Sequence, residues 1–234
     1  MTSEPVVGAL HGSLLSTLGT AIVSGRYPAG DVLTLDGVST QHGLSRSVVR
    51  EVIRVLESMG MVESRRRVGI TIRASDKWNV FDPRLIRWRL EAGDRAAQLA
   101  SLSELRRGFE PAAAGLAARR ADPDQCRIMA AAVSDMVMHG RAGDLDAYLE
   151  ADKLFHRTLL EASGNEMFRA LNDVVSEVLT GRTHHRMMPA TPNPAAIDLH
   201  DQVARAIRMG DEAAAEQAMR AIIDEASSAV AEQD

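Results

Sequence analysis

The sequence predicts a mainly α-helical protein of two domains, with β-structure confined to the N-terminal third. Hydrophobic residues make up 45% of the 234 residues and aromatic residues only 3%, with alanine, leucine and methionine prominent. Such a composition favours helices and is sufficient for a packed core. Strand-like alternation occurs near residues 32–35 and 70–73, whereas residues 84–234 contain about six or seven helical runs separated by short breaks.

The N-terminal elements are short and clearly bounded. Residues 8–24 are predicted to form an amphipathic helix that ends at Gly25. A turn at Pro28 and Gly30 leads to the short strand 32–35, and a short helix over 36–42 ends at Gly43.

The next segment combines a capped helix with a basic hairpin. Ser45 can cap a helix N-terminus, and Arg46, Ser47 and Arg50 then lie on the first turns. The apolar positions that would pack behind this face are Val49, Val52, Ile53 and Leu56. After Gly60, the triplet Arg65, Arg66 and Arg67 precedes Gly69 and an alternating strand. Together these elements predict a winged helix-turn-helix with a small β-wing, followed by a C-terminal all-α bundle.

The charge distribution agrees with nucleic-acid binding by this segment. The net charge of the chain is −5. Residues 44–73 nevertheless hold seven arginines against three glutamates. Only the face that meets DNA needs to be positive for attraction to phosphates.

Composition also bears on the cellular compartment of the protein and on its division into domains. Cys126 is the single cysteine, so an internal disulfide framework is excluded and a reducing cytoplasm is expected. We expect no signal peptide and no membrane span. We predict a DNA-binding domain over residues 1–73, a linker over 74–83 pinned by Trp78 and Phe81, and a helical effector-binding and dimerisation domain over 84–234.

Two motif sets carry a family resemblance. In the first 73 residues they are Pro28-Ala29-Gly30, then Leu44 to Glu51, then Leu56 to Val62, and Gly69. Further along they are Leu105 and Arg106 with Phe109 to Ala113, Asp152 with Phe155 and His156, Ala162 to Asn165, and His200 with Gly210 and Asp211. The chain resembles the FadR branch of the GntR family of bacterial regulators, whose second half is the helical FCD ligand-sensing domain. Residues 78–88 further resemble members that sense sugar acids such as gluconate or galactonate.

The resemblance implies roles on the DNA side. Arg46 and Arg50 would read bases, since an arginine fork can donate two hydrogen bonds to guanine. Ser45 and Ser47 would hold phosphates, and Arg66, Arg67 and Gly69 would place the wing against the minor groove or backbone. One position departs from the family pattern: Asp36 stands near where many members have a phosphate-binding arginine.

A candidate metal site lies in the second half. Asp152 and His156 are four residues apart on one predicted helix and point the same way, and His200 begins a later helix. A carboxylate with imidazoles suits a divalent ion such as zinc, nickel or manganese. By resemblance these are three of four ligands, and the fourth position is Ile222, which cannot bind a metal. The alternative is a polar cluster that binds the effector directly.

Three further polar residues are candidates for the same cavity. By resemblance Arg106 faces it and would clamp an effector carboxylate. His184 and His185 diverge on a helix, so at most one would add a ligand, and a surface pair is the simpler interpretation.

The sequence therefore predicts a ligand-responsive transcription regulator rather than an enzyme. The expected form is a homodimeric repressor of a carbohydrate-acid or carboxylate catabolic operon, released from a near-palindromic DNA operator by a small carboxylate effector. The alternatives are a metal-sensing regulator and, more remotely, a metal-dependent hydrolase built on Asp152, His156 and His200.

Overall fold

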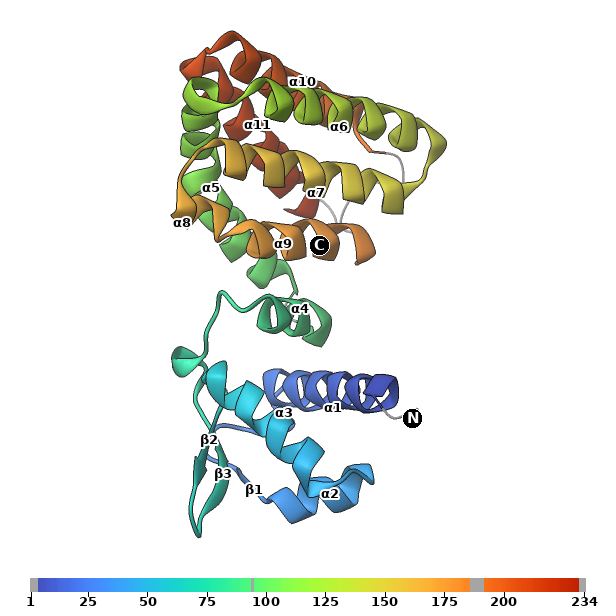
Figure 1. Ribbon diagram of the computed structural model, residues 1–234, viewed down its shortest axis with the longest axis vertical. Helices are drawn as coiled ribbons and strands as arrows, with labels where there is room; N and C mark the ends of the chain where they lie inside the picture. Colours follow the sequence, from blue (N-terminus) through green and yellow to red (C-terminus); the bar gives the residue numbers. More distant parts are fainter. Residues whose placement is uncertain (1–3, 94, 186–191, 232–234) are drawn as a thin grey trace. The chain divides into compact units, whose positions relative to one another are not determined.

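The chain forms two compact units, residues 1–95 and 96–234 (Figure 1). The computed structural model describes residues 4–93, 95–185 and 192–231. The chain is mainly α-helical with one small sheet, as the sequence predicts. No helix in these described ranges is long and apolar enough to cross a membrane.

The N-terminal unit has the elements of a winged helix-turn-helix. Its helices are α1 (Glu4–Val23), α2 (Leu35–His42), α3 (Arg46–Ser58) and α4 (Pro83–Ala92), with a short 3-10 turn, η1 (Ser75–Lys77). Its strands are β1 (Val32–Leu33), β2 (Val62–Arg65) and β3 (Gly69–Ile72), which form an antiparallel sheet in the order β1-β3-β2. The hairpin of β2 and β3 is the predicted wing.

Local sequence fixes the boundaries of α2 and α3. Thr34 caps α2 by accepting from the Gly37 amide, and Gly43 ends it in the left-handed conformation with φ of 63°. Ser45 then caps α3 by accepting from the Val48 amide. The predicted apolar face of α3 is buried, and it joins one core with α1 and the wing; its members are Val49, Val52, Ile53 and Leu56.

Backbone geometry determines the shape of the wing. Arg67 adopts a left-handed conformation, with φ of 66°, at the tip between β2 and β3. Gly69 has φ of 120°, and a Cβ there would lie 2.7 Å from the Leu33 carbonyl oxygen of β1. Glycine is therefore required at position 69 by the close approach of two strands, independently of any contact with DNA.

Residues 74–92 pack on the N-terminal unit. Trp78 is half-buried and donates through Nε1 to the Arg73 carbonyl at 3.0 Å, whereas Phe81 is 51% exposed. In α4, Leu85 and Trp88 join the core that contains α1 and α3. The sequence prediction assigned α4 to the C-terminal domain, but the division between the compact units falls near residue 95 because these apolar side chains face α1.

The C-terminal unit is built of helices within the described ranges. They are α5 (Arg95–Arg120), α6 (Pro123–Ala142), α7 (Leu145–Ala162), α8 (Glu166–Arg169), α9 (Asn172–His184), α10 (Pro194–Met209) and α11 (Glu212–Ala231). In Figure 1, α6 and α7 lie side by side, as do α10 and α11. One core joins these helices, with Phe109, Met129, Phe155 and Met219 among its buried members.

The packing of α4 on α1 gives a stability prediction. A Cβ at Gly19 of α1 would overlap the Trp88 ring of α4. Gly19→Ala should therefore lower the free energy of unfolding of the N-terminal unit by about 1–3 kcal/mol, as expected of overpacking. Gly12→Ala is the matched control, because position 12 of α1 is exposed and meets no atom within 4 Å. It should stabilise by up to about 1 kcal/mol through helix propensity. Urea unfolding measures both, and equal effects would contradict the packing.

Candidate functional site

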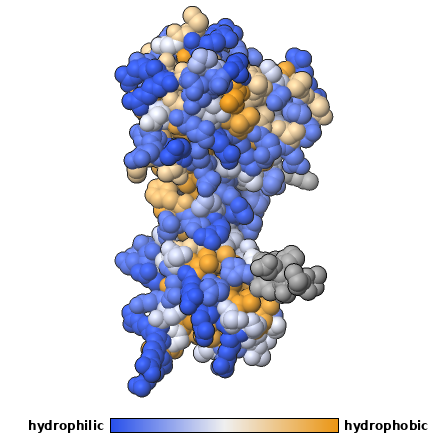
Figure 2. Space-filling model, in the orientation of Figure 1, coloured by the Kyte–Doolittle hydropathy of each residue, from blue (hydrophilic) through white to orange (hydrophobic). Residues whose placement is uncertain are grey.

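Exposed arginines of the N-terminal unit lie at the start of α3 and on the wing. Arg46 and Arg50 on α3 are exposed, as are Arg66 and Arg67 at the wing tip. The projecting hairpin is coloured hydrophilic in Figure 2, in agreement with these side chains. The Ser45 and Ser47 hydroxyls lie 2.9 Å apart at the N-terminus of α3, where backbone amides favour an anion.

These arginines differ in whether they have a partner. Arg46 forms an ion pair with Asp36 of α2, and both side chains are more than 60% exposed. Arg54 pairs with Glu51, and Arg65 with Glu63. Within the described part of the chain, no carboxylate pairs with Arg50, Arg66 or Arg67. Asp36, which departs from the family pattern, is thus the partner of a predicted base reader.

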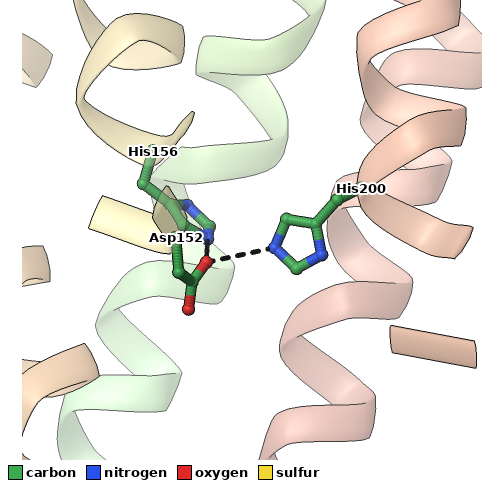
Figure 3. Close-up of side chains that lie close together, drawn as sticks. All are labelled: Asp152, His156 and His200. Carbon is green, nitrogen blue, oxygen red and sulfur yellow. Dashed lines mark ion pairs between the residues drawn. The ribbon is translucent and has the colours of Figure 1, made fainter. Parts of the chain in front are cut away.

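In the C-terminal unit, Asp152, His156 and His200 converge as the sequence predicts (Figure 3). Asp152 and His156 are one turn apart on α7, and His200 reaches them from α10. Asp152 Oδ1 lies 3.4 Å from His156 Nε2 and 3.3 Å from His200 Nε2. One ligand atom from each residue lies within 4.8 Å of the others, and all three side chains are buried.

The proton on His200 can be placed from its second nitrogen. His200 Nδ1 lies 2.7 Å from the Ala196 carbonyl oxygen, which can only accept, so Nδ1 donates. In neutral His200 the Nε2 atom then carries a lone pair that points at Asp152 Oδ1, another acceptor. Neither atom has a hydrogen-bond partner in the described structure. A positive charge, either a proton or a metal cation, is needed between them.

Arg106 is held by a residue of its own helix. Its Nε lies 2.5 Å from Glu110 Oε1 and its Nη2 3.2 Å from Glu110 Oε2, four positions along α5. Glu110 Oε2 also lies 2.8 Å from His156 Nδ1. Arg106 Nη2 in turn lies 3.4 Å from His156 Nε2. Arg106 is therefore part of a buried charge network with Glu110 and His156, and two of its nitrogens are already committed.

Burial and charge act in opposite directions on this network. Burial raises the pKa of Glu110, but the charges of Arg106 and His156 outweigh it and hold that pKa at about 2. Burial also raises the pKa of Asp152, but His156 and His200 bring it well below its usual range. For His156, burial lowers the pKa, and Glu110 and Asp152 reverse this and raise it. Both carboxylates are thus ionised at neutral pH.

A cavity of about 40 Å³ adjoins these residues. It accommodates only a few waters, so a larger ligand requires it to open. Ile222 of α11 lines it and is buried, so the position of the expected fourth ligand does face the site. Its other polar lining residues are Arg106, Tyr148, Arg182, Thr183, Asn193 and Glu225. His184 is not among them; it is 56% exposed at the end of α9 and lies 3.8 Å from Asp146.

The sequence did not predict the roles of Glu110 and Arg182. Glu110 stands four residues after Arg106, which is the spacing of a helical ion pair, and this was the available signal. Arg182 of α9 stands between the buried residues Gly181 and Thr183. Nothing in its spacing marks it as a cavity residue, because the turn of α9 toward the cavity is set by tertiary packing.

The buried pair predicts a specific response to mutation. Glu110→Gln leaves Arg106 buried without its counter-charge, so the free energy of unfolding of the C-terminal unit should fall by about 3 kcal/mol at pH 7. Because Gln resembles protonated Glu110, the gap to the wild type should shrink as the pH falls from 4.5, the ordinary value, to about 2.

Denaturant unfolding at several pH values measures this gap. The matched control is Glu150→Gln on α7, whose side chain is 72% exposed and pairs with Lys153. It should change the unfolding free energy by less than about 1 kcal/mol. A gap that is small at pH 7, or that widens in acid, would contradict the network.

Comparison with known proteins places both units. Residues 13–72 match the family model "Bacterial regulatory proteins, gntR family", and residues 101–225 match the FCD domain model. The galactonate operon transcriptional repressor of Escherichia coli (strain K12) is 29% identical over 212 residues, or 90% of this chain and 92% of that protein. The probable D-xylose utilization operon transcriptional repressor of Paenarthrobacter nicotinovorans is 28% identical over 203 residues, or 85% and 78%.

Solved structures agree with these matches. Streptococcus agalactiae GntR is 25% identical, with a TM-score of 0.52, over 93% of this chain and 99% of that one. A Listeria monocytogenes structure, titled for the control of the agr system by Lar, shares the fold at 17% identity, with a TM-score of 0.59 over 96% and 97%. The relatives are regulators and not enzymes. The chain belongs to the GntR family of bacterial regulatory proteins and is a DNA-binding transcription regulator with an FCD ligand-sensing domain.

Proposed function

We propose that this regulator is a homodimeric repressor of a carboxylate or sugar-acid catabolic operon, and that a small carboxylate effector releases it from its operator in the cytoplasm. The observation that supports this most strongly is the pairing of two features in one chain. Exposed arginines lie at the start of a capped helix in the N-terminal unit. A cavity in the FCD unit is lined by two histidines, an aspartate and two arginines. The galactonate repressor is a relative over 90% of the chain.

On the DNA side, α3 is the proposed recognition helix. Arg46 and Arg50 lie on its first turns, where a helix in the major groove meets base edges. Ser45 and Ser47 would hold phosphate, and Arg66 and Arg67 at the wing tip would contact the minor groove or backbone. Two copies related by a two-fold axis would read a near-palindromic operator.

On the sensing side, Asp152, His156 and His200 are the proposed ligands of a divalent zinc, nickel or manganese ion. The residues fit such an ion because the facing lone pairs of Asp152 Oδ1 and His200 Nε2 have no partner in the described structure. When bound, the ion would supply positive charge for carboxylate or hydroxyl oxygens of the effector. Ile222 leaves the protein set at three ligands, so coordination positions stay available to effector oxygens or water.

The switch requires that the effector bind one arrangement of the dimer better than another. Effector-binding residues proposed from the sequence are Arg106, Asp152, His156 and His200, which all line the cavity. Because Glu110 engages Arg106, the main role of Arg106 is to orient Glu110 and His156. The N–H groups of Arg106 that Glu110 does not occupy would donate to the effector.

A second function, sensing of the metal itself, is favoured by one observation. The facing acceptors on Asp152 and His200 call for a cation even without an organic ligand. The test is operator binding titrated with zinc, nickel or manganese while no organic acid is present. Release of DNA by metal alone would replace the carboxylate proposal with this one.

The recognition helix can be tested by one substitution. Arg50→Ala should reduce operator affinity at least tenfold and relax preference at one base position, because a two-bond contact to guanine contributes about 1–3 kcal/mol. Arg54→Ala is the control on the same helix, since Arg54 pairs with Glu51 at 2.7 Å. It should leave sequence preference unchanged. Competition binding with mutated operators measures both, and unchanged preference in Arg50→Ala would contradict the assignment of α3.

The incomplete ligand set can be tested by completing it. Ile222→His should place an imidazole beside Asp152 and His200 and tighten zinc binding at least tenfold, as measured by competition with a chelator. Asp152→Asn should weaken zinc binding by a similar factor or more. Ala226→His, which lines the same cavity one turn further along α11, is the matched control and should give no such gain. Equal zinc affinity in the wild type and Ile222→His would contradict the metal proposal.

A further inference from the structure

Arg182 is a cavity residue whose guanidinium makes no direct ion pair or hydrogen bond with the described residues. It lies on α9 and lines the cavity together with Asp152, His156 and His200. Its Nε atom is buried and has no hydrogen-bond partner, and no described carboxylate forms an ion pair with its guanidinium. The side chain as a whole is half-buried. A partly desolvated cation without a direct partner is costly, so such a group marks a place where an anionic ligand can bind.

The surroundings of Arg182 differ from those of Arg106. The fork of Arg106 is engaged by Glu110 at 2.5 Å and 3.2 Å. Arg182 has no such partner one turn before it on α9, where Val178 and Leu179 are apolar and buried. Glu225 and Tyr148 line the same cavity, and Glu225 instead accepts from Asn193 at 3.1 Å. Burial first, and then the positive charge of Arg106, lowers the pKa of Arg182, and the more distant Asp152 and Glu225 only partly oppose this.

The cavity therefore has two complementary needs. The facing acceptors Asp152 Oδ1 and His200 Nε2 need positive charge. The unpartnered guanidinium of Arg182 needs an anion. A ligand that meets the second need carries a carboxylate, which matches a guanidinium in size and can take two hydrogen bonds from it.

We propose that Arg182 is the residue that receives the carboxylate of the effector, and that it makes the cavity selective for acids over the corresponding neutral sugars. This inference rests on the proposed effector-released regulator and specifies the chemistry of its site. The proposed selectivity separates an acid, such as the galactonate named for one relative, from a neutral sugar, such as the D-xylose named for another. A neutral sugar leaves the Arg182 charge unpaired, whereas an acid removes that penalty.

The same reasoning gives a readout that needs no ligand. If Arg182 is unpaired in the free protein, replacing it with an apolar side chain of similar length removes a cost. Arg182→Met should therefore raise the melting temperature of the ligand-free chain by about 2–4 °C. A residue with a merely structural ion pair would give the opposite sign.

The experiment uses the full-length chain and a thermal-shift series. The probes are D-galactonate, D-gluconate and D-xylonate, against galactitol, D-glucose and D-xylose, with zinc present throughout. The wild type should be stabilised by at least one acid and by no neutral compound. Arg182→Met should lose that response, requiring at least tenfold more acid. Arg157→Met, an exposed change of equal charge on α7, is the control and should respond as the wild type does.

The outcomes separate this inference from the proposed function. An acid response that survives in Arg182→Met, or a ligand-free melting temperature that falls in this variant, overturns the role of Arg182 and leaves the acid-responsive regulator standing. If only neutral sugars stabilise the wild type, the proposed selectivity for acids is wrong, but the protein still responds to a ligand. A wild type that binds no probe and stays on its operator with every one of them overturns both.

Discussion

The interaction on which the C-terminal unit depends is the neutralisation of charge inside a helical core. Arg106, Glu110 and His156 are buried together, and each would be unfavourable without the others. Glu110 binds the cation of α5 and orients the imidazole of α7, so the ring of His156 is fixed before any ligand arrives. Phe155 packs edge-on against the His200 ring, with centroids 5.0 Å apart, and limits its movement. The site is therefore organised by its own helices.

The two units use charge in different ways. In the N-terminal unit, the core is apolar and the arginines are exposed to solvent. Their attraction to phosphate is long-ranged and depends on salt. In the C-terminal unit, charged side chains line a small cavity, where they interact strongly. A ligand that leaves one of these groups without a partner there is disfavoured. One chain thus combines a contact surface suited to rapid encounter with DNA and a cavity suited to selecting a small molecule.

Patterns along the chain predicted what depends on local sequence. The cap at Ser45, the apolar face behind Arg50 and the one-turn spacing of Asp152 and His156 are local features, and the structure has them. The assignment of His200 to the same site came from resemblance, since no local rule brings α10 to α7. Arg182 and the packing of α4 on α1 were not foreseen, because they depend on which helix face tertiary contacts bury. Glu110 enters the sequence analysis only as part of the motif Phe109 to Ala113, and its carboxylate holds Arg106 and His156 together.

The pairing of Asp36 with Arg46 has a consequence for how this regulator searches a genome. Asp36 already engages Arg46, the arginine proposed to read a base, so DNA binding in the proposed mode first breaks that pair. The cost is the same on all sequences, and it lowers affinity for the many random sites. At the operator, the proposed two-bond contact from Arg46 to a base would replace the lost pair. A carboxylate that pairs with Arg46 in this way would shorten the time spent on wrong sequences, and the ratio of specific to random binding governs occupancy.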